Sequence, residues 1–163
     1  MPAGSHPTVS RKELLADGRD DAFRMLVTDL LLFGDALRQA REQIAAAMGV
    51  SAPQYAILMA VARFGANGPT VSDVAGILRV SVPFIVAQNR GLVAAGLLRK
   101  QPDREDARRV RLALSPACRA ALERLAPLQC RINDTLFAGL DAAEFSALHR
   151  ALRKLARPQE DAA

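Results

Sequence analysis

The sequence predicts a mainly α-helical protein with one small β-hairpin, and three observations lead to this fold class. Half of the 163 residues are apolar and Trp is absent, with Ala and Leu prominent, a composition typical of a helical core. Apolar residues recur at helical spacing along most of the chain. One run, RKQPDREDARRVRLAL at 99–114, instead places a charged loop between two short segments suited to strands.

The first long helix is predicted from Asp21 to about Met48. It follows residues 1–18, which contain no continuous apolar segment and are expected to form a loose leader. The apolar stripe of this helix consists of Phe23, Leu26, Leu30, Phe33, Leu37 and Ile44. A helix of roughly 40 Å is longer than one small core requires. We therefore expect part of the stripe, with Val27 and Leu31, to pack against a second subunit; the alternative is a helix that spans its own domain.

The next segment contains the signals of three shorter helices. Ser51-x-x-Gln54 is a capping-box spacing that begins a helix over 52–64, and Thr70 caps another. After a tight turn at Arg79 and Val80, Ser81 caps a further helix that ends at Gly96. Two helices joined by a three-residue turn form the arrangement that many proteins use to contact DNA.

The charged run follows directly on this last helix. Residues 97–101 and 110–114 are predicted strands, and Pro102 to Arg109 form the loop between them, a wing. Arginine at the tip of such a hairpin can enter the minor groove of DNA, while Asp106 can hold Arg108 in an extended conformation. The alternative is a solvated surface loop. The net charge of +5 and the pI near 10.0 favour a polyanionic partner.

Two further helices are predicted at the C-terminal end. Ser115-Pro116 begins one, and Asp141-x-x-Glu144 begins the other. Their apolar positions are Leu122, Leu125, Leu128, Ile132 and Leu136 in the first helix, and Phe145, Leu148, Leu152 and Leu155 in the second. These stripes suit a helical dimerisation region.

The runs TVSDVAGILRVS and LVAAGLLRKQPDREDARRVRLALS resemble the MarR family of winged-helix transcriptional regulators. The wing of that family carries a D-x-x-D-x-R pattern, matched here by Asp103, Asp106 and Arg108. The resemblance implies a winged helix-turn-helix lobe plus a helical dimerisation region in an intertwined homodimer, which binds a palindromic operator in double-stranded DNA as a repressor. The expected divisions are a leader (1–18), an N-terminal dimerisation helix (19–48), a DNA-binding lobe (49–115) and C-terminal dimerisation helices (116–163).

The residues expected to contact DNA lie on the two helix starts, the recognition helix and the wing. They are Thr70, Ser81, Val82, Pro83, Val86, Ala87, Arg90, Arg104, Asp106, Arg108 and Arg109. The recognition helix departs from many relatives because apolar residues occupy its groove-facing positions, which favours thymine methyl contacts, Arg90 and DNA shape over hydrogen-bond recognition. Gln88 and Asn89 either face the interior, which we favour, or contact adenine.

Regulators of this family respond to small aromatic or phenolic ligands in a crevice between the dimer core and the lobe. Candidate lining residues here are Phe33, Leu37, Tyr55, Met59 and Gln88. The alternative is that these side chains are ordinary core residues.

Other functions have less support in the sequence. No nucleophile, paired carboxylates, metal-ligand spacing or phosphate loop is present, so no enzyme, catalytic residue, metal or cofactor is predicted. We expect a cytoplasmic protein with no membrane partner. Cys118 and Cys130 on one helix are roughly 18 Å apart, too far for a disulfide; they are either small buried residues or a redox pair across the dimer. A winged-helix module that binds protein is the remaining alternative.

Overall fold

The structure, a computed structural model, describes residues 6–103 and 109–156. The helices are α1 (Asp21–Ala47), α2 (Ala52–Ala62), α3 (Val71–Leu78), α4 (Val82–Ala94), α5 (Pro116–Leu136) and α6 (Ala142–Leu155), with 3-10 turns η1 (Lys12–Leu14) and η2 (Gly65–Asn67). Strands β1 (Leu98–Pro102) and β2 (Val110–Leu114) form an antiparallel hairpin in which Leu98 pairs with Leu114 and Pro102 with Val110. The predicted mainly α fold with a small β-wing is confirmed.

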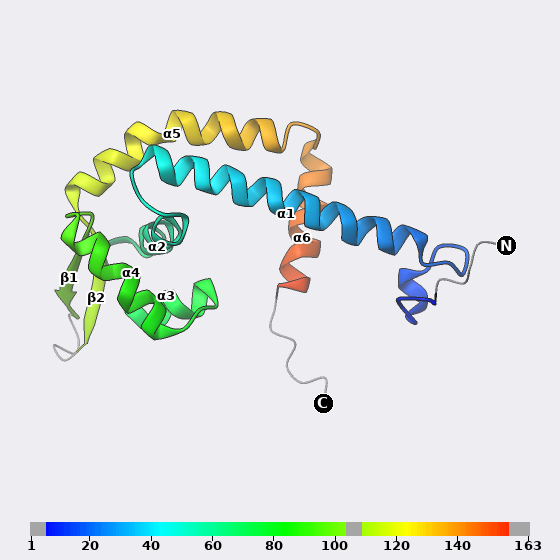
Figure 1. Ribbon diagram of the computed structural model, residues 1–163, viewed down its shortest axis with the longest axis horizontal. Helices are drawn as coiled ribbons and strands as arrows, with labels where there is room; N and C mark the ends of the chain where they lie inside the picture. Colours follow the sequence, from blue (N-terminus) through cyan, green and yellow to red (C-terminus); the bar gives the residue numbers. More distant parts are fainter. Residues whose placement is uncertain (1–5, 104–108, 157–163) are drawn as a thin grey trace.

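The molecule is elongated, with a compact lobe at one end (Figure 1). Helices α2, α3 and α4 and the hairpin form the lobe, while α1 and α5 run side by side away from it (Figure 1). Helix α6 leaves the far end of α5 (Figure 1). Within the described ranges, no single helix is long and apolar enough to cross a membrane; the bent pairs α1–α2 and α3–α4 reach that length only when each pair is taken together.

The main hydrophobic core lies inside the lobe. Its fully buried side chains come from every lobe element and include Ile57, Leu58, Val74, Ile85, Leu92, Leu98 and Leu112; the first turn of α5 adds Cys118. A second, smaller cluster joins α1 and α5 to α2 through Ile44, Tyr55 and Leu125. The lobe therefore has a core of its own, and the long helices are attached to it at one end.

The predicted helix starts are confirmed. Ser51, Thr70 and Asp141 each form a complete capping box, and the hydroxyls of Ser81 and Ser115 accept hydrogen bonds from backbone N–H groups three residues later. Each cap satisfies N–H groups that would otherwise lack a partner at a helix N-terminus.

Two predicted boundaries were wrong. Helix α2 ends at Ala62, and Phe64 instead precedes the 3-10 turn η2. Strand β1 begins at Leu98 and not at Leu97. The Leu97 N–H instead donates to the Leu92 carbonyl at 2.9 Å and so ends α4. Gly96 allows this turn because its φ is +69°.

Much of the apolar stripe of α1 is exposed in the single chain. Only Ile44 and Ala45 of this helix are buried. Its exposed large apolar residues, between 38% and 69% accessible, are Met25, Leu26, Val27, Leu30, Leu31 and Leu32. Phe145, Leu152 and Leu155 of α6 are also exposed. These two helices together present an apolar surface that the rest of the described chain does not cover.

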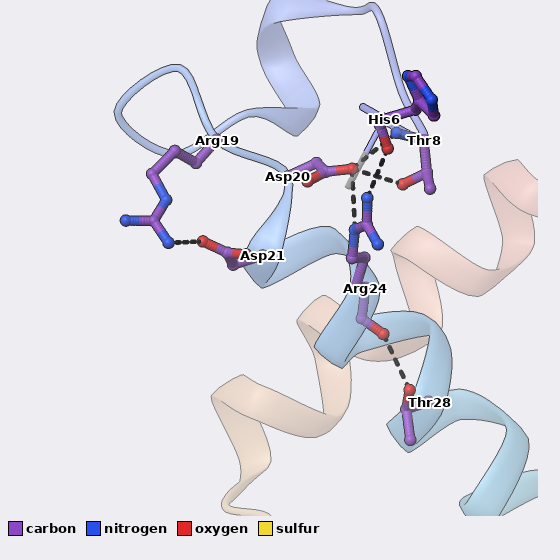
Figure 2. A network of polar contacts seen from close by, with 7 residues as sticks. All are labelled: His6, Thr8, Arg19, Asp20, Asp21, Arg24 and Thr28. Atoms are coloured by element: carbon purple, nitrogen blue, oxygen red, sulfur yellow. Dashed lines mark hydrogen bonds and ion pairs between the residues drawn. The ribbon is translucent and has the colours of Figure 1, made fainter. Parts of the chain in front are cut away.

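The predicted loose leader differs from the structure over residues 6–18, because Asp20 anchors this segment to the start of α1 (Figure 2). Its carboxylate accepts hydrogen bonds at 2.7 Å from both the backbone N–H and the hydroxyl of Thr8. Arg24 adds an ion pair to Asp20 at 3.0 Å and donates to the His6 carbonyl at 2.6 Å. Polar contacts, which apolar periodicity does not reveal, therefore attach the leader.

We expect Asp20→Ala to release the leader without unfolding the lobe. The Thr8 hydrogen bonds, helped by Arg24, lower the pKa of Asp20 to about 2. A lowered pKa in the folded state means that this contact stabilises the protein above the ordinary Asp pKa and is lost as pH falls through about 2. Hydrogen exchange of the Thr8 amide should accelerate in the variant at neutral pH. Asp21→Ala is the control, since Asp21 pairs with the exposed Arg19. A Thr8 amide that stays protected from exchange in Asp20→Ala would show that Asp20 does not anchor the leader.

Candidate nucleic-acid interface

Helices α3 and α4 form a helix-turn-helix. Their axes are inclined by 112° across residues 79–81. Arg79 makes the turn in a left-handed conformation, with φ +53°. The Arg79 guanidinium donates to the Ala156 carbonyl at the end of α6. The turn is thereby tied to the C-terminal helix.

The start of α3 is fixed by a reciprocal pair of hydrogen bonds. The Asp73 carboxylate accepts from the Thr70 N–H at 2.8 Å, and the Thr70 hydroxyl accepts from the Asp73 N–H at 3.1 Å. Hydrogen bonds from the Thr70 backbone and side chain lower the pKa of Asp73. The Thr70 and Ser81 hydroxyls, both predicted DNA contacts, thus serve as helix caps in this structure.

Helix α4 has one buried and one exposed face. Ile85, Asn89 and Leu92 are buried against the lobe core. The predicted groove-facing residues are all exposed; they are Val82, Pro83, Val86, Ala87 and Arg90. Spacings of three and four residues place these five side chains on one face of the helix. The structure therefore brings this group of sequence candidates together on a single surface.

The side chain of Asn89 faces the interior, as favoured from the sequence, while Gln88 is half-buried. Asn89 is 3% exposed, and neither atom of its amide has a hydrogen-bond partner among the described residues. An unsatisfied buried amide lowers stability because it has lost its hydrogen bonds to water. The adenine contact considered for Asn89 is excluded by this orientation.

We expect Asn89→Leu to increase the free energy of unfolding by about 1–2 kcal/mol, since it removes the buried amide and adds an apolar side chain of similar size. Urea unfolding measures the change, and Gln88→Leu at the half-buried neighbouring position is the control. A decrease in stability would mean that the amide finds a partner in the folded protein.

The base of the wing is held by Arg111. This side chain forms an ion pair with the buried carboxylate of Asp103 and donates to the Gly68 carbonyl at 2.9 Å. The Asp103 N–H also donates to the Arg109 carbonyl at 2.9 Å, and the Leu112 N–H to the Pro69 carbonyl at 2.8 Å. The first Asp of the D-x-x-D-x-R pattern is therefore a structural residue. Its partner Arg111 was missed, because the contact depends on the strand register.

The tip of the wing lies outside the described residues, and with it the predicted contacts Arg104, Asp106 and Arg108. Arg109, at the edge of the described part, is exposed. The described base places the ends of the hairpin beside the N-terminus of α3, since Thr70 forms an isolated β-bridge with Arg111.

A cavity of about 440 Å³ lies between the lobe and the long helices. Leu37, Tyr55 and Met59 line it, whereas Gln88 does not, and Phe33 packs edge-on against Phe137 beside another hollow. The sequence reasoning missed its polar lining, which is Arg41, Arg63, Gln129 and Asn133. The Tyr55 hydroxyl is buried without a partner among the described residues, and burial raises the pKa of Tyr55. This hydroxyl stays protonated at neutral pH and can donate a hydrogen bond.

The two cysteines occupy different environments. Cys118 is fully buried in the lobe core, and burial raises the pKa of its thiol, which disfavours the reactive thiolate. Cys130 on α5 is exposed. A redox role across a dimer would therefore depend on Cys130.

Comparison with known proteins shows a match to one protein family and to several solved structures. Residues 48–109 match the model of the MarR family. A search of curated protein sequences returns no match. The fold is similar to that of CouR from Rhodococcus jostii RHA1 bound to p-coumaroyl-CoA, with a TM-score of 0.72, 20% identity, and coverage of 85% of this chain and 94% of CouR.

Two other solved structures extend the likeness. The S. aureus MepR–DNA complex has a TM-score of 0.64 and 19% identity, covering 89% of this chain and 96% of MepR. A MarR-family transcriptional regulator from Silicibacter pomeroyi has a TM-score of 0.64 and 24% identity, covering 94% of this chain and 100% of that protein. Residues 48–109 of this chain thus match the MarR family, and the described chain shares the winged-helix fold of these structures.

Proposed function

We propose that this protein is a DNA-binding transcriptional regulator that acts as a homodimeric repressor on a palindromic operator. The observation that carries this proposal is the exposed face of α4, which ends in Arg90 and lies on a helix-turn-helix next to an arginine-rich wing. A recognition helix of this kind enters the major groove, and the wing contacts the flanking backbone or minor groove. MepR, which shares the fold, is bound to DNA in its structure.

Dimerisation is supported by the apolar surface of α1 and α6. Leu26, Leu30 and Leu31 of the long helix α1 stay in contact with water unless another chain covers them, which is unfavourable for apolar side chains. In a two-fold dimer the same surface would meet itself, and the two lobes would contact half-sites about one helical turn apart. On this proposal residues 49–115 form the DNA-binding lobe, and 19–48 with 116–163 form the dimerisation region.

Selection of bound duplexes from random-sequence DNA tests the proposed function. We expect the selected sequences to share a palindrome whose half-sites are centred about 10 base pairs apart. A selection that recovers no common sequence, together with an absence of binding to bulk duplex DNA, would contradict it and favour a winged-helix module that binds protein.

We further propose that a small aromatic or phenolic ligand binds in the cavity lined by Tyr55 and releases the protein from DNA. The volume of about 440 Å³ suits a small molecule. Arg41 and Arg63 offer positive charge to a carboxylate or phenolate, while the Tyr55 hydroxyl offers a hydrogen bond. The relative CouR binds p-coumaroyl-CoA, a phenolic thioester. Adding phenolic acids to the complex with the selected duplex tests whether they displace the DNA.

A further inference from the structure

We infer that α4 recognises its DNA target through the C5-methyl groups of thymine, with Val82 and Val86 as the contacting side chains. The inference rests on the proposed function, and it specifies the chemistry of the operator. It depends on three properties of α4, which are the composition of its N-terminal half, the exposure of the two valines and the charge around them.

The N-terminal half of α4 has no polar side chain. Residues 82–87 read VPFIVA, six consecutive apolar residues at the end of the helix that enters a major groove. Ile85 is buried in the core and is unavailable. Val82 and Val86 are 42% and 39% exposed, one helical turn apart, and Pro83 and Ala87 are exposed beside them. The surface offered to base edges is therefore apolar.

An apolar surface of this kind favours thymine over the other bases. Thymine is the base that presents an apolar group, its C5-methyl, in the major groove, whereas cytosine presents an amino donor and guanine two acceptors. A valine placed against a donor or acceptor removes it from water without supplying a hydrogen bond, which weakens binding. Contact with a methyl group instead buries apolar surface on both partners. Val82 and Val86 thus favour thymine at the base pairs they face.

The charge around this surface favours DNA as its occupant. Arg90 lies one turn after Val86 on the same face, is exposed, and makes no hydrogen bond or ion pair with another residue in the described ranges. Exposed Arg109 lies at the start of β2, and the whole chain has a net charge of +5. An apolar surface that continues into the cationic Arg90 matches base edges that lie beside phosphates.

The test compares a selected duplex with the same duplex in which deoxyuridine replaces thymidine, one position at a time. This change removes the C5-methyl and leaves every Watson–Crick hydrogen bond in place. We expect about fourfold weaker binding for each methyl that α4 contacts, and about fifteenfold for a symmetry-related pair. Val82→Ala and Val86→Ala should each lose this discrimination at one position. Val93→Ala is the matched control, because Val93 is an exposed valine of the same helix, 38% accessible, near its C-terminal end.

The outcomes separate the inference from the proposed function. Methyl sensitivity that is confined to a few thymines and disappears in Val82→Ala or Val86→Ala supports the inference. Tight binding of the selected duplex with no loss of affinity on uracil substitution would overturn the inference, but it would leave the proposed function as a DNA-binding regulator standing. Sensitivity that persists unchanged in both valine variants would also overturn it, since other groups would then contact the methyls. Failure to bind any duplex would remove the proposed function itself.

Discussion

Leu31→Asp is expected to dissociate the proposed dimer and abolish binding to the proposed operator. Leu31 is 69% exposed on α1, within the apolar surface that we assign to the subunit interface. A carboxylate on that surface would be buried twice in a symmetric dimer, at a cost of about 3–5 kcal/mol per subunit. A single lobe contacts one half-site and loses the gain in affinity that comes from linking two half-sites. Sedimentation measures the mass, and titration of the selected duplex measures the affinity.

The lobe of this variant should remain folded, because the buried residues of its core come from α2, α3, α4, the hairpin and the first turn of α5, and none comes from α1. Gln39→Asp adds the same charge at an exposed polar position of the same helix and should remain dimeric. A Leu31→Asp protein that sediments as a dimer would show that α1 does not form the interface.

Gly68→Ala is expected to destabilise the lobe by about 3 kcal/mol or more. Gly68 has φ +62° and ψ 160°, a region open almost exclusively to glycine. A Cβ at this position would lie 2.1 Å from the Leu112 carbonyl oxygen, which belongs to the backbone of β2. Either the loop or the strand must move, and the Arg111 contact with the Gly68 carbonyl is lost with it. Urea unfolding should show a lower midpoint.

Gly49→Ala separates the effect of conformation from that of the clash. Gly49 also has a positive φ, +75°, but a Cβ there meets no atom within 4 Å. The left-handed conformation alone costs an alanine about 1–2 kcal/mol. Equal destabilisation by the two substitutions would mean that β2 does not approach Gly68 closely.

The sequence was most informative where structure depends on neighbouring residues. The capping signals at Ser51, Thr70 and Asp141 involve partners three residues away, so local spacing was enough to predict them. The same holds for the buried and exposed faces of α4, which follow the helical period. The family pattern in the wing identified Asp103 but not its partner.

Features that depend on the folded chain could not be predicted in this way. Arg111 reaches Gly68 across 43 residues, and Thr8 reaches Asp20 across 12. Arg41 and Arg63 line one cavity because α1 and α2 diverge by 85°, an angle that no local pattern specifies. The strand boundary at Leu98 was missed because the Leu97 N–H closes the end of α4.

The salt dependence of binding to duplex DNA tests whether the lobe is a DNA-binding surface. A protein that neutralises several phosphates releases their counterions, so the logarithm of the binding constant should fall linearly with the logarithm of salt concentration, with a slope of about −0.9 per phosphate contacted. We predict a slope steeper than about −4 for the intact dimer, since each lobe presents a basic wing and Arg90. Binding that does not change with salt, or no binding at low salt, would show that the lobe does not contact DNA phosphates.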